Sequence, residues 1–151
     1  MAVNADFRDL FFDFNDANVR YLVVGAYAVT FHAQPRFTKD LDIWIDAHGD
    51  NAQRAWEALA KFGAPLDDVT PSDLATPGMI LQIGVAPNRI DILTSLEGVD
   101  FEDAWPRRDT TRYGDCEIGI LSKPDLIENK RRVARPQDLI DVETLSEESE
   151  N

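Results

Sequence analysis

The chain has 151 residues, and its 28 acidic side chains against 15 Lys and Arg give a formal net charge of −13. This length predicts one domain with a core large enough to fold without disulfides, and the charge argues against a broad grip along nucleic-acid phosphates. Cys116 is the single cysteine, which excludes an internal disulfide framework and a cysteine-based zinc site. Without a secretory signal, or an apolar run near the roughly 20 residues that span a membrane, we expect a cytoplasmic protein.

Apolar spacing and turn residues predict a mixture of helices and strands. In chain order these are a helix over residues 6–15, a strand over 20–24, a helix over 26–33, a strand over 41–46, a helix over 51–62, strands over 79–85, 89–93 and 116–121, and helices over 122–132 and 135–145. A hairpin is expected around residues 86–88. The order favours an α+β fold, a mixed sheet with helices packed on it, in one domain over residues 1–145. Residues 146–151 are expected to form an acidic, fraying tail.

The most informative residues are two aspartates: Asp42 in the strand over residues 41–46, and Asp40 just before that strand. Asp40 and Asp42 share one face of a strand, while Leu41 and Ile43 take the other. Carboxylates about 7 Å apart along a strand repel unless a cation lies between them, and Mg²⁺ is a common solution. Asp-x-Asp alone is also typical of the polar face of an edge strand, so further residues must decide.

Two neighbours strengthen the metal interpretation. Asp91 interrupts an otherwise apolar strand, where a lone acid needs either a metal or an ion pair, for example with Arg89. Gly25 follows a strand and opens a helix, which leaves free backbone N–H groups that suit an anion. Taken alone, the glycine is more typical of an ordinary strand-to-helix turn.

Together these residues resemble the nucleotidyltransferase superfamily, in particular its minimal, abortive-infection-toxin-like (AbiEii-type) branch. The resemblance rests on the glycine turn at Gly25, the Arg-x-Thr-x-Asp-x-Asp string that ends at Asp42, and Asp91 as a third carboxylate. It continues into residues 129–141, where a lysine and a later Arg-x-x-Asp pair match a helical motif. It covers most of the chain, from about residue 21 to residue 145.

The resemblance implies a magnesium-dependent transfer of a nucleotidyl group from an NTP to an acceptor. Asp40, Asp42 and Asp91 would hold the metal, and Lys130 would act beside them, either on the triphosphate or by holding the acidic cluster in place. The residues implied to bind the nucleotide are Gly25, Ala26, Tyr27, Arg36, Thr38 and Lys39. Many relatives carry Ser or Gly where this chain has Ala26, so only backbone donors remain in the turn.

Two other functions stay open at this point. One is a binding or regulatory module that keeps the fold without the chemistry, for example one partner of a toxin–antitoxin pair, acting with a partner protein or as a homo-oligomer. The other is a plain acidic domain without a metal. The acceptor could be a small molecule, a protein or tRNA. Residues 123–135 hold five Lys and Arg against two acidic side chains, so an RNA acceptor would have to be gripped there.

Overall fold

The computed structural model describes residues 3–33, 40–85 and 87–150, with the side chains of residues 148–150 left aside. Its elements in chain order are α1 (Ala5–Asp16), β1 (Tyr21–Val24), α2 (Gly25–His32), β2 (Asp40–Ile45), α3 (Gly49–Phe62), α4 (Pro71–Leu74), β3 (Ile80–Ile83), β4 (Arg89–Leu93), α5 (Phe101–Ala104), the short 3-10 helix η1 (Trp105–Arg107), β5 (Asp109–Tyr113), β6 (Cys116–Ile120), α6 (Lys123–Val133) and α7 (Pro136–Glu150).

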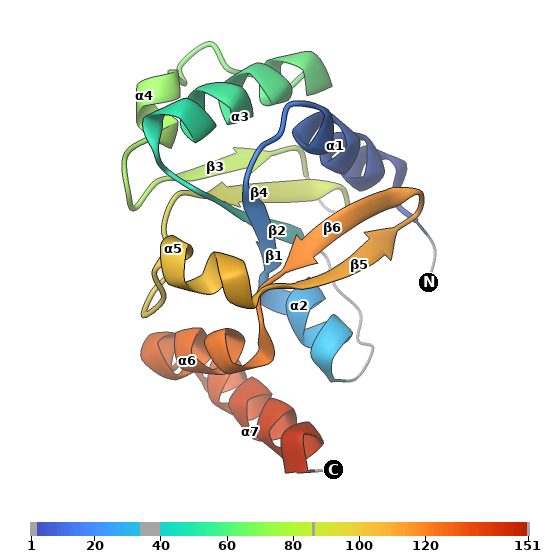
Figure 1. Cartoon of the computed structure of the whole chain (residues 1–151), viewed down its shortest axis with the longest axis vertical. Coiled ribbons are helices and arrows are strands. Elements are labelled where there is room, and N and C mark those ends of the chain that lie inside the picture. Colours follow the sequence, from blue (N-terminus) through green and yellow to red (C-terminus); the bar gives the residue numbers. More distant parts are fainter. Residues whose placement is uncertain (1–2, 34–39, 86, 151) are drawn as a thin grey trace.

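The strands form one six-stranded mixed sheet in the order β3-β4-β2-β1-β6-β5 (Figure 1). β1 and β2 are antiparallel neighbours joined through α2, and β4 lies parallel to β2 on its other side. Two hairpins, β3/β4 and β5/β6, extend the sheet at its ends. The first of these is the hairpin that the sequence predicts, and the α+β class is confirmed.

The two faces of the sheet carry different side chains because successive residues of a strand point to opposite sides. Tyr21 of β1 shares a face with its partner Ile45 of β2, and the rings of Phe11 and Phe14 in α1 lie 6.0 and 5.4 Å from the Tyr21 ring. α3 packs beside α1 (Figure 1). Asp42 of β2 therefore lies on the face opposite to α1.

Local signals explain where the helices begin and end. The Asn4 side chain accepts hydrogen bonds from the first turn of α1, and Ser122 caps α6 in the same way. Gly63 ends α3 in the left-handed conformation, with φ of 99°. These caps fall where the sequence predicts helix boundaries.

Some elements differ from the prediction. The sequence pattern does not predict β5, because its residues are mostly polar and only one neighbouring strand pairs with it. It does not predict the short elements α4, α5 and η1 either. α7 continues to Glu150, past residue 145, after which the sequence places the tail.

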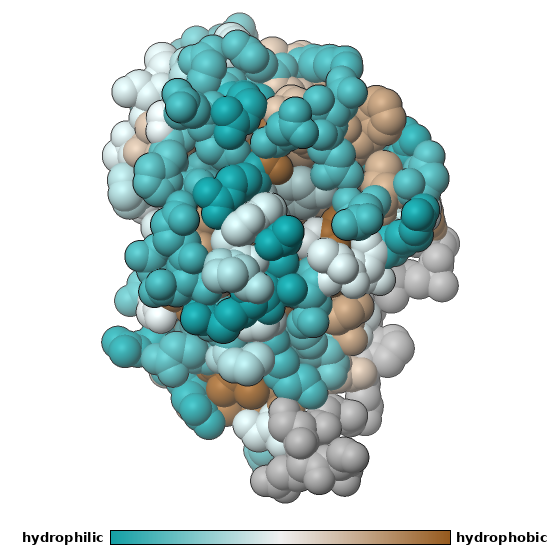
Figure 2. Space-filling view, in the orientation of Figure 1, coloured by the Kyte–Doolittle hydropathy of each residue, from teal (hydrophilic) through white to brown (hydrophobic). Residues whose placement is uncertain are grey.

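The surface shown in Figure 2 is mainly hydrophilic, as the high content of charged residues predicts. Among the described residues, no helix is both long enough and apolar enough to cross a membrane.

Candidate functional site

The pairing of β2 with β4 brings the predicted carboxylates to one place. The two strands are parallel, and their register sets Asp42 directly beside Asp91 and Asp40 beside Arg89. Asp40 and Asp42 share a face, so three carboxylates and one guanidinium gather on the sheet face opposite to α1. The sequence could propose this convergence, but only the register establishes it.

The turn between β1 and α2 lies in close contact with Asp42 of this cluster. Gly25 has φ of 67°, in the left-handed region, and a Cβ atom on it would overlap Oδ2 of Asp42. Val24, just before it, is the β1 partner of Asp42. No side chain caps the N-terminus of α2, so its first backbone N–H groups remain available beside the carboxylates. Glycine is thus required here for both conformation and space.

Gly25→Ala is expected to lower the free energy of unfolding by more than about 1 kcal/mol, because alanine is strained at positive φ and also displaces the Asp42 carboxylate. Urea unfolding measures the loss. Gly78→Ala is the matched control, since Gly78 also has positive φ but nothing lies within 4 Å of the position that an added methyl group would occupy. A loss for Gly25→Ala no larger than that for Gly78→Ala would show that contact with Asp42 does not restrict this position.

Asp42 lies in an environment that opposes its charge. Burial, followed by the neighbouring charges of Asp91 and Asp40, raises the pKa of Asp42 from 3.8 to about 7. The positive charges of Arg89 and Lys130 act in the opposite direction but do not compensate. A half-buried carboxylate beside like charges is a position at which a bound divalent cation would bring a large electrostatic gain.

This shift predicts a pH-dependent effect of Asp42→Asn on stability. Between about pH 4 and pH 7 the folded chain keeps a proton on Asp42 that the unfolded chain has lost, so the contribution of Asp42 to stability falls as pH rises. Without divalent ions, we expect the variant to exceed the wild type by at least about 1 kcal/mol at pH 8 and to match it near pH 4. Urea unfolding at both pH values checks this; a pH-independent difference would contradict it.

Arg89 is the resident cation of the cluster. Its Nε and Nη2 donate to the two carboxylate oxygens of Asp91, each at 3.1 Å, and its Nε lies 3.7 Å from Oδ2 of Asp40. The other oxygen of Asp40, Oδ1, is buried and has no hydrogen-bond partner. Three carboxylates and one guanidinium leave a net negative charge, and Oδ1 of Asp40 remains an unsatisfied ligand atom. Both features fit an added cation.

Lys130 lies in a second, buried ion-pair cluster next to this one. Its Nζ is 3.2 Å from Asp138 and 2.9 Å from Asp141, and its side chain is only 8% exposed. Arg135 Nε donates to Asp138 at 2.7 Å. Burial raises the pKa of Asp138, but hydrogen bonds from Arg135 and Lys130 outweigh burial and lower it. Of the two roles implied for Lys130, this geometry favours holding acidic groups in place, with its charge acting on Asp42 through space.

The other residues predicted to bind the nucleotide do not all lie at the candidate site. Ala26 is in the first turn of α2, at the edge of the site. The Tyr27 ring instead packs edge-on against Phe7 of α1, with centroids 5.9 Å apart, and so lies on the other face of the sheet. Arg36, Thr38 and Lys39 lie outside the described residues.

A second group of possible metal ligands lies at the far end of β2. Asp46, His48 and Glu102 are the one described set of three or more His, Cys, Asp or Glu ligand atoms within 4.8 Å of one another. Asp40, Asp42 and Asp91 do not meet that spacing with Arg89 between them. Arg20 already lies 3.3 Å from Asp46 and 3.4 Å from Glu102, so this second group carries its own counter-charge.

Comparison with known proteins ties this arrangement to one fold. The chain aligns over 97% of its length with 98% of the lincosamide antibiotic adenylyltransferase LnuA in its lincomycin-bound crystal structure, with a TM-score of 0.55 and 17% identity. A proposed nucleotidyltransferase from Thermotoga maritima aligns over 93% of this chain and 88% of its own, with a TM-score of 0.57 and 14% identity. The chain has a nucleotidyltransferase fold. An antigenic nucleotidyltransferase-like protein from Paracoccidioides brasiliensis gives a TM-score of 0.52 at 14% identity, over 93% of this chain and 74% of that one.

No family model and no curated protein sequence matches the chain, so the likeness is one of structure. Within this nucleotidyltransferase fold, Arg89 is the residue whose role the sequence understates. Its place two residues before Asp91 suggests the pair with Asp91, but the contact with Asp40 follows only from the β2–β4 register.

Proposed function

We propose that this chain binds an NTP together with Mg²⁺ and transfers the nucleotidyl group to an acceptor. The observation that supports this most is the alignment of Asp42 with Asp91 across β2 and β4, directly beside the uncapped start of α2. Carboxylates that suit a hard divalent cation and backbone donors that suit phosphate are thereby placed together. The fold shared with an adenylyltransferase is compatible with this chemistry.

In the proposed reaction Asp40, Asp42 and Asp91 would hold the metal. When bound there, Mg²⁺ would supply charge neutralisation to the triphosphate and to the attacking and leaving oxygens of an in-line displacement. The N–H groups at the start of α2 bind phosphate oxygens, and Gly25 allows the backbone to approach closely. Arg89, which pairs with Asp91 beside the carboxylates, would supply positive charge to the phosphate oxygens. Lys130 and Arg135 keep the neighbouring acidic residues of α7 paired, so that their charge does not add to the site.

The proposal is tested by nucleotide binding and transfer with the purified chain. Titration of ATP, GTP, CTP and UTP should show binding of at least one nucleotide in the presence of Mg²⁺ and a loss of that binding in EDTA. A nucleotide labelled at the α-phosphate should pass its label to an acceptor and release pyrophosphate. Nucleotide binding that is equally tight without any divalent ion would contradict the proposed site.

The contacts of Arg89 favour one second candidate, a binding or regulatory module that keeps the nucleotidyltransferase fold and does not catalyse. Its guanidinium bridges Asp91 and Asp40, the residues that would otherwise share a cation, and Ala26 offers no hydroxyl to a phosphate. Such a module would act by binding a partner protein, for example within a toxin–antitoxin pair of the abortive-infection-toxin-like branch.

Arg89→Gln separates the two candidates. If Arg89 only stands in for the metal until substrate arrives, removing its charge should tighten Mg²⁺ binding by about tenfold, equivalent to ~1.4 kcal/mol, because the carboxylates lose a competing cation. Isothermal titration with Mg²⁺ measures the change, and Arg112→Gln, an exposed arginine on β5, controls for the loss of one positive charge. If neither wild type nor Arg89→Gln binds Mg²⁺, the non-catalytic module is the better description.

The class of acceptor is the finer part of the proposal. Because the net charge is −13, a long RNA or DNA is disfavoured. Residues 123–135 carry most of the local positive charge, but Lys130 and Arg135 of that segment already pair with Asp138 of α7. A small molecule or a protein hydroxyl needs no such surface. We therefore place these first, with tRNA held only at that segment.

A further inference from the structure

β3 forms one edge of the sheet, and its outer side is exposed. The strand packs mainly against β4, and no described strand pairs with its other side (Figure 1). The Thr94 N–H donates to the Met79 carbonyl at 3.1 Å, which continues the register of the β3–β4 ladder. Because successive residues of an antiparallel strand direct their backbone groups to opposite sides, the N–H and C=O groups of Ile80 and Gln82 point outwards. Four backbone groups are thus available to another strand.

This edge does not carry the side chains that normally protect an edge strand. Natural edge strands use charged residues, proline or bulges to prevent pairing with another chain. Residues 74–88 contain no Asp, Glu, Lys, Arg or His, although charged residues make up 28% of the chain, and no proline lies between Met79 and Ile83. Ile80 is 63% exposed, and Met79 and Val85 are exposed as well. The edge is therefore apolar, uncharged and suited to pair with a further strand.

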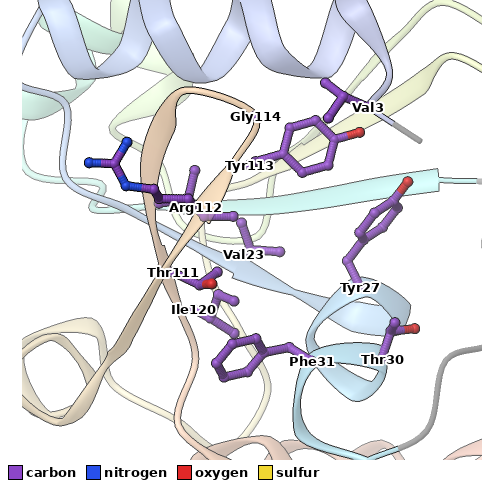
Figure 3. A pocket seen from close by; sticks show the side chains of 11 residues that line it. Val3, Val23, Tyr27, Thr30, Phe31, Thr111, Arg112, Tyr113, Gly114 and Ile120 are labelled. Atoms are coloured by element: carbon purple, nitrogen blue, oxygen red, sulfur yellow. The ribbon is translucent and has the colours of Figure 1, made fainter. Parts of the chain in front are cut away.

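The other edge of the sheet, β5, has a different character. It contains Asp109 and the exposed Arg112, whose side chain extends away from the cavity between α2 and the β5/β6 hairpin (Figure 3). That cavity measures about 320 Å³ and has Phe31 of α2 and Tyr113 of β5 in its lining. Charged side chains on an edge strand oppose pairing, so an added strand is expected at β3 rather than at β5.

The net charge of −13 restricts where two copies of this chain can meet. Like charges placed opposite each other in paired strands are destabilising. Two β3 edges bring no charged side chain of residues 74–88 into contact. A second copy can therefore approach here without the repulsion that the rest of the acidic surface would cause.

The β3 segment also matches itself in geometry. Gly78 and Gly84 have φ of 86° and 74°, in the left-handed region, and so bound an extended stretch centred on Leu81. Antiparallel pairing about a twofold axis at Leu81 places Ile80 opposite Gln82 of the second copy. This register joins all four outward backbone groups of each copy.

We propose that two copies of this chain pair through their β3 strands, antiparallel and with Leu81 opposite Leu81, into one continuous sheet. Gln82 is the β4 partner of Asp91, so the carboxylate clusters of both copies lie on the same side of that sheet. The carboxylates take no part in the pairing, which is therefore independent of nucleotide transfer. Because the contact is small, we expect monomer and dimer to exchange, with a Kd in the micromolar range.

Sedimentation equilibrium of the full chain tests this proposal. The wild type should dimerise reversibly. Gln82→Pro removes one outward N–H per copy and leaves the β3–β4 ladder intact, so it should weaken the dimer at least tenfold. Ile80→Lys adds a charge to the shared edge and should weaken it as strongly. Thr110→Lys, an exposed position on β5, is the control and should leave Kd within twofold of the wild type.

Cysteine cross-linking tests the register. Leu81 would face its own copy in a non-hydrogen-bonded pair, with Cα atoms about 4.5 Å apart, which suits a disulfide. Leu81→Cys should therefore form a covalent dimer on mild oxidation. Gln82→Cys should not, because its two copies would lie more than about 7 Å apart. The native Cys116 is buried and does not compete.

Urea unfolding of each variant establishes that it folds, and Ile80→Lys, at an exposed position, serves if Gln82→Pro does not. A wild type that stays monomeric at millimolar concentration would overturn the proposal. So would equal losses in Ile80→Lys and Thr110→Lys, or cross-linking of Gln82→Cys as readily as Leu81→Cys, since the copies would then pair elsewhere.

Discussion

Replacing Asp40 and Asp42 together by asparagine is expected to abolish Mg²⁺-dependent nucleotide binding and to reduce transfer by about 1,000-fold or more, equivalent to ~4 kcal/mol in the transition state. Asparagine preserves the size of each side chain but removes two of the three negative charges that would bind the metal. The fold should survive, because a charged Asp42 is a cost to the folded chain at neutral pH. Titration of the nucleotide with Mg²⁺ and a labelled-NTP assay measure the two losses.

Asp46→Asn is the matched control for that double variant. Asp46 follows β2 directly and shares the face of Asp42, yet it is held by His48 and by Arg20, away from the proposed site. Its loss is expected to lower stability while leaving Mg²⁺-dependent binding unchanged. If the double variant still binds the nucleotide with Mg²⁺ as tightly as the wild type, Asp40 and Asp42 do not hold the metal.

Lys130→Met is expected to lower the free energy of unfolding by about 3 kcal/mol or more, since it leaves two buried carboxylates without their shared cation. Asp138 and Asp141 are 4% and 3% exposed at their side chains, so water cannot replace the lysine. Urea unfolding at pH 7 measures the loss. A Lys130→Met variant with Asp138→Leu and Asp141→Leu should recover much of it, because the buried charges then disappear together.

Arg131→Met provides the comparison for Lys130→Met. It removes one positive charge from the neighbouring position of α6, where the side chain is exposed, and should change stability by less than about 0.5 kcal/mol. Similar small losses for both variants would show that the Lys130 cluster does not stabilise the packing of α6 against α7.

Most strands of the sheet and most helices could be predicted, because their residues favour one kind of secondary structure locally. The alternation in residues 41–46 identifies β2, and Ser122 and Gly63 mark helix boundaries through capping. β5 could not be predicted, because polar residues at a sheet edge lack the alternation of a half-buried strand.

Only part of the candidate site could be predicted from the sequence. Asp40, Asp42 and Asp91 could be selected because charged residues in apolar strands require a partner. Their relation depends on the β2–β4 register, which joins residues almost fifty positions apart and leaves no local signal. The burial of Lys130 was likewise hidden, because its segment resembles a solvated, charged helix until α7 packs against it.

The location of a bound divalent cation decides most directly whether this chain is a metal-dependent nucleotidyltransferase. Mn²⁺ can replace Mg²⁺ and be located by anomalous scattering in crystals soaked with a non-hydrolysable NTP analogue. We expect an anomalous peak between Asp40, Asp42 and Asp91, with the guanidinium of Arg89 moved from the carboxylates towards the phosphates. A peak found only at Asp46, His48 and Glu102, or no peak with the nucleotide bound, would contradict the proposed site.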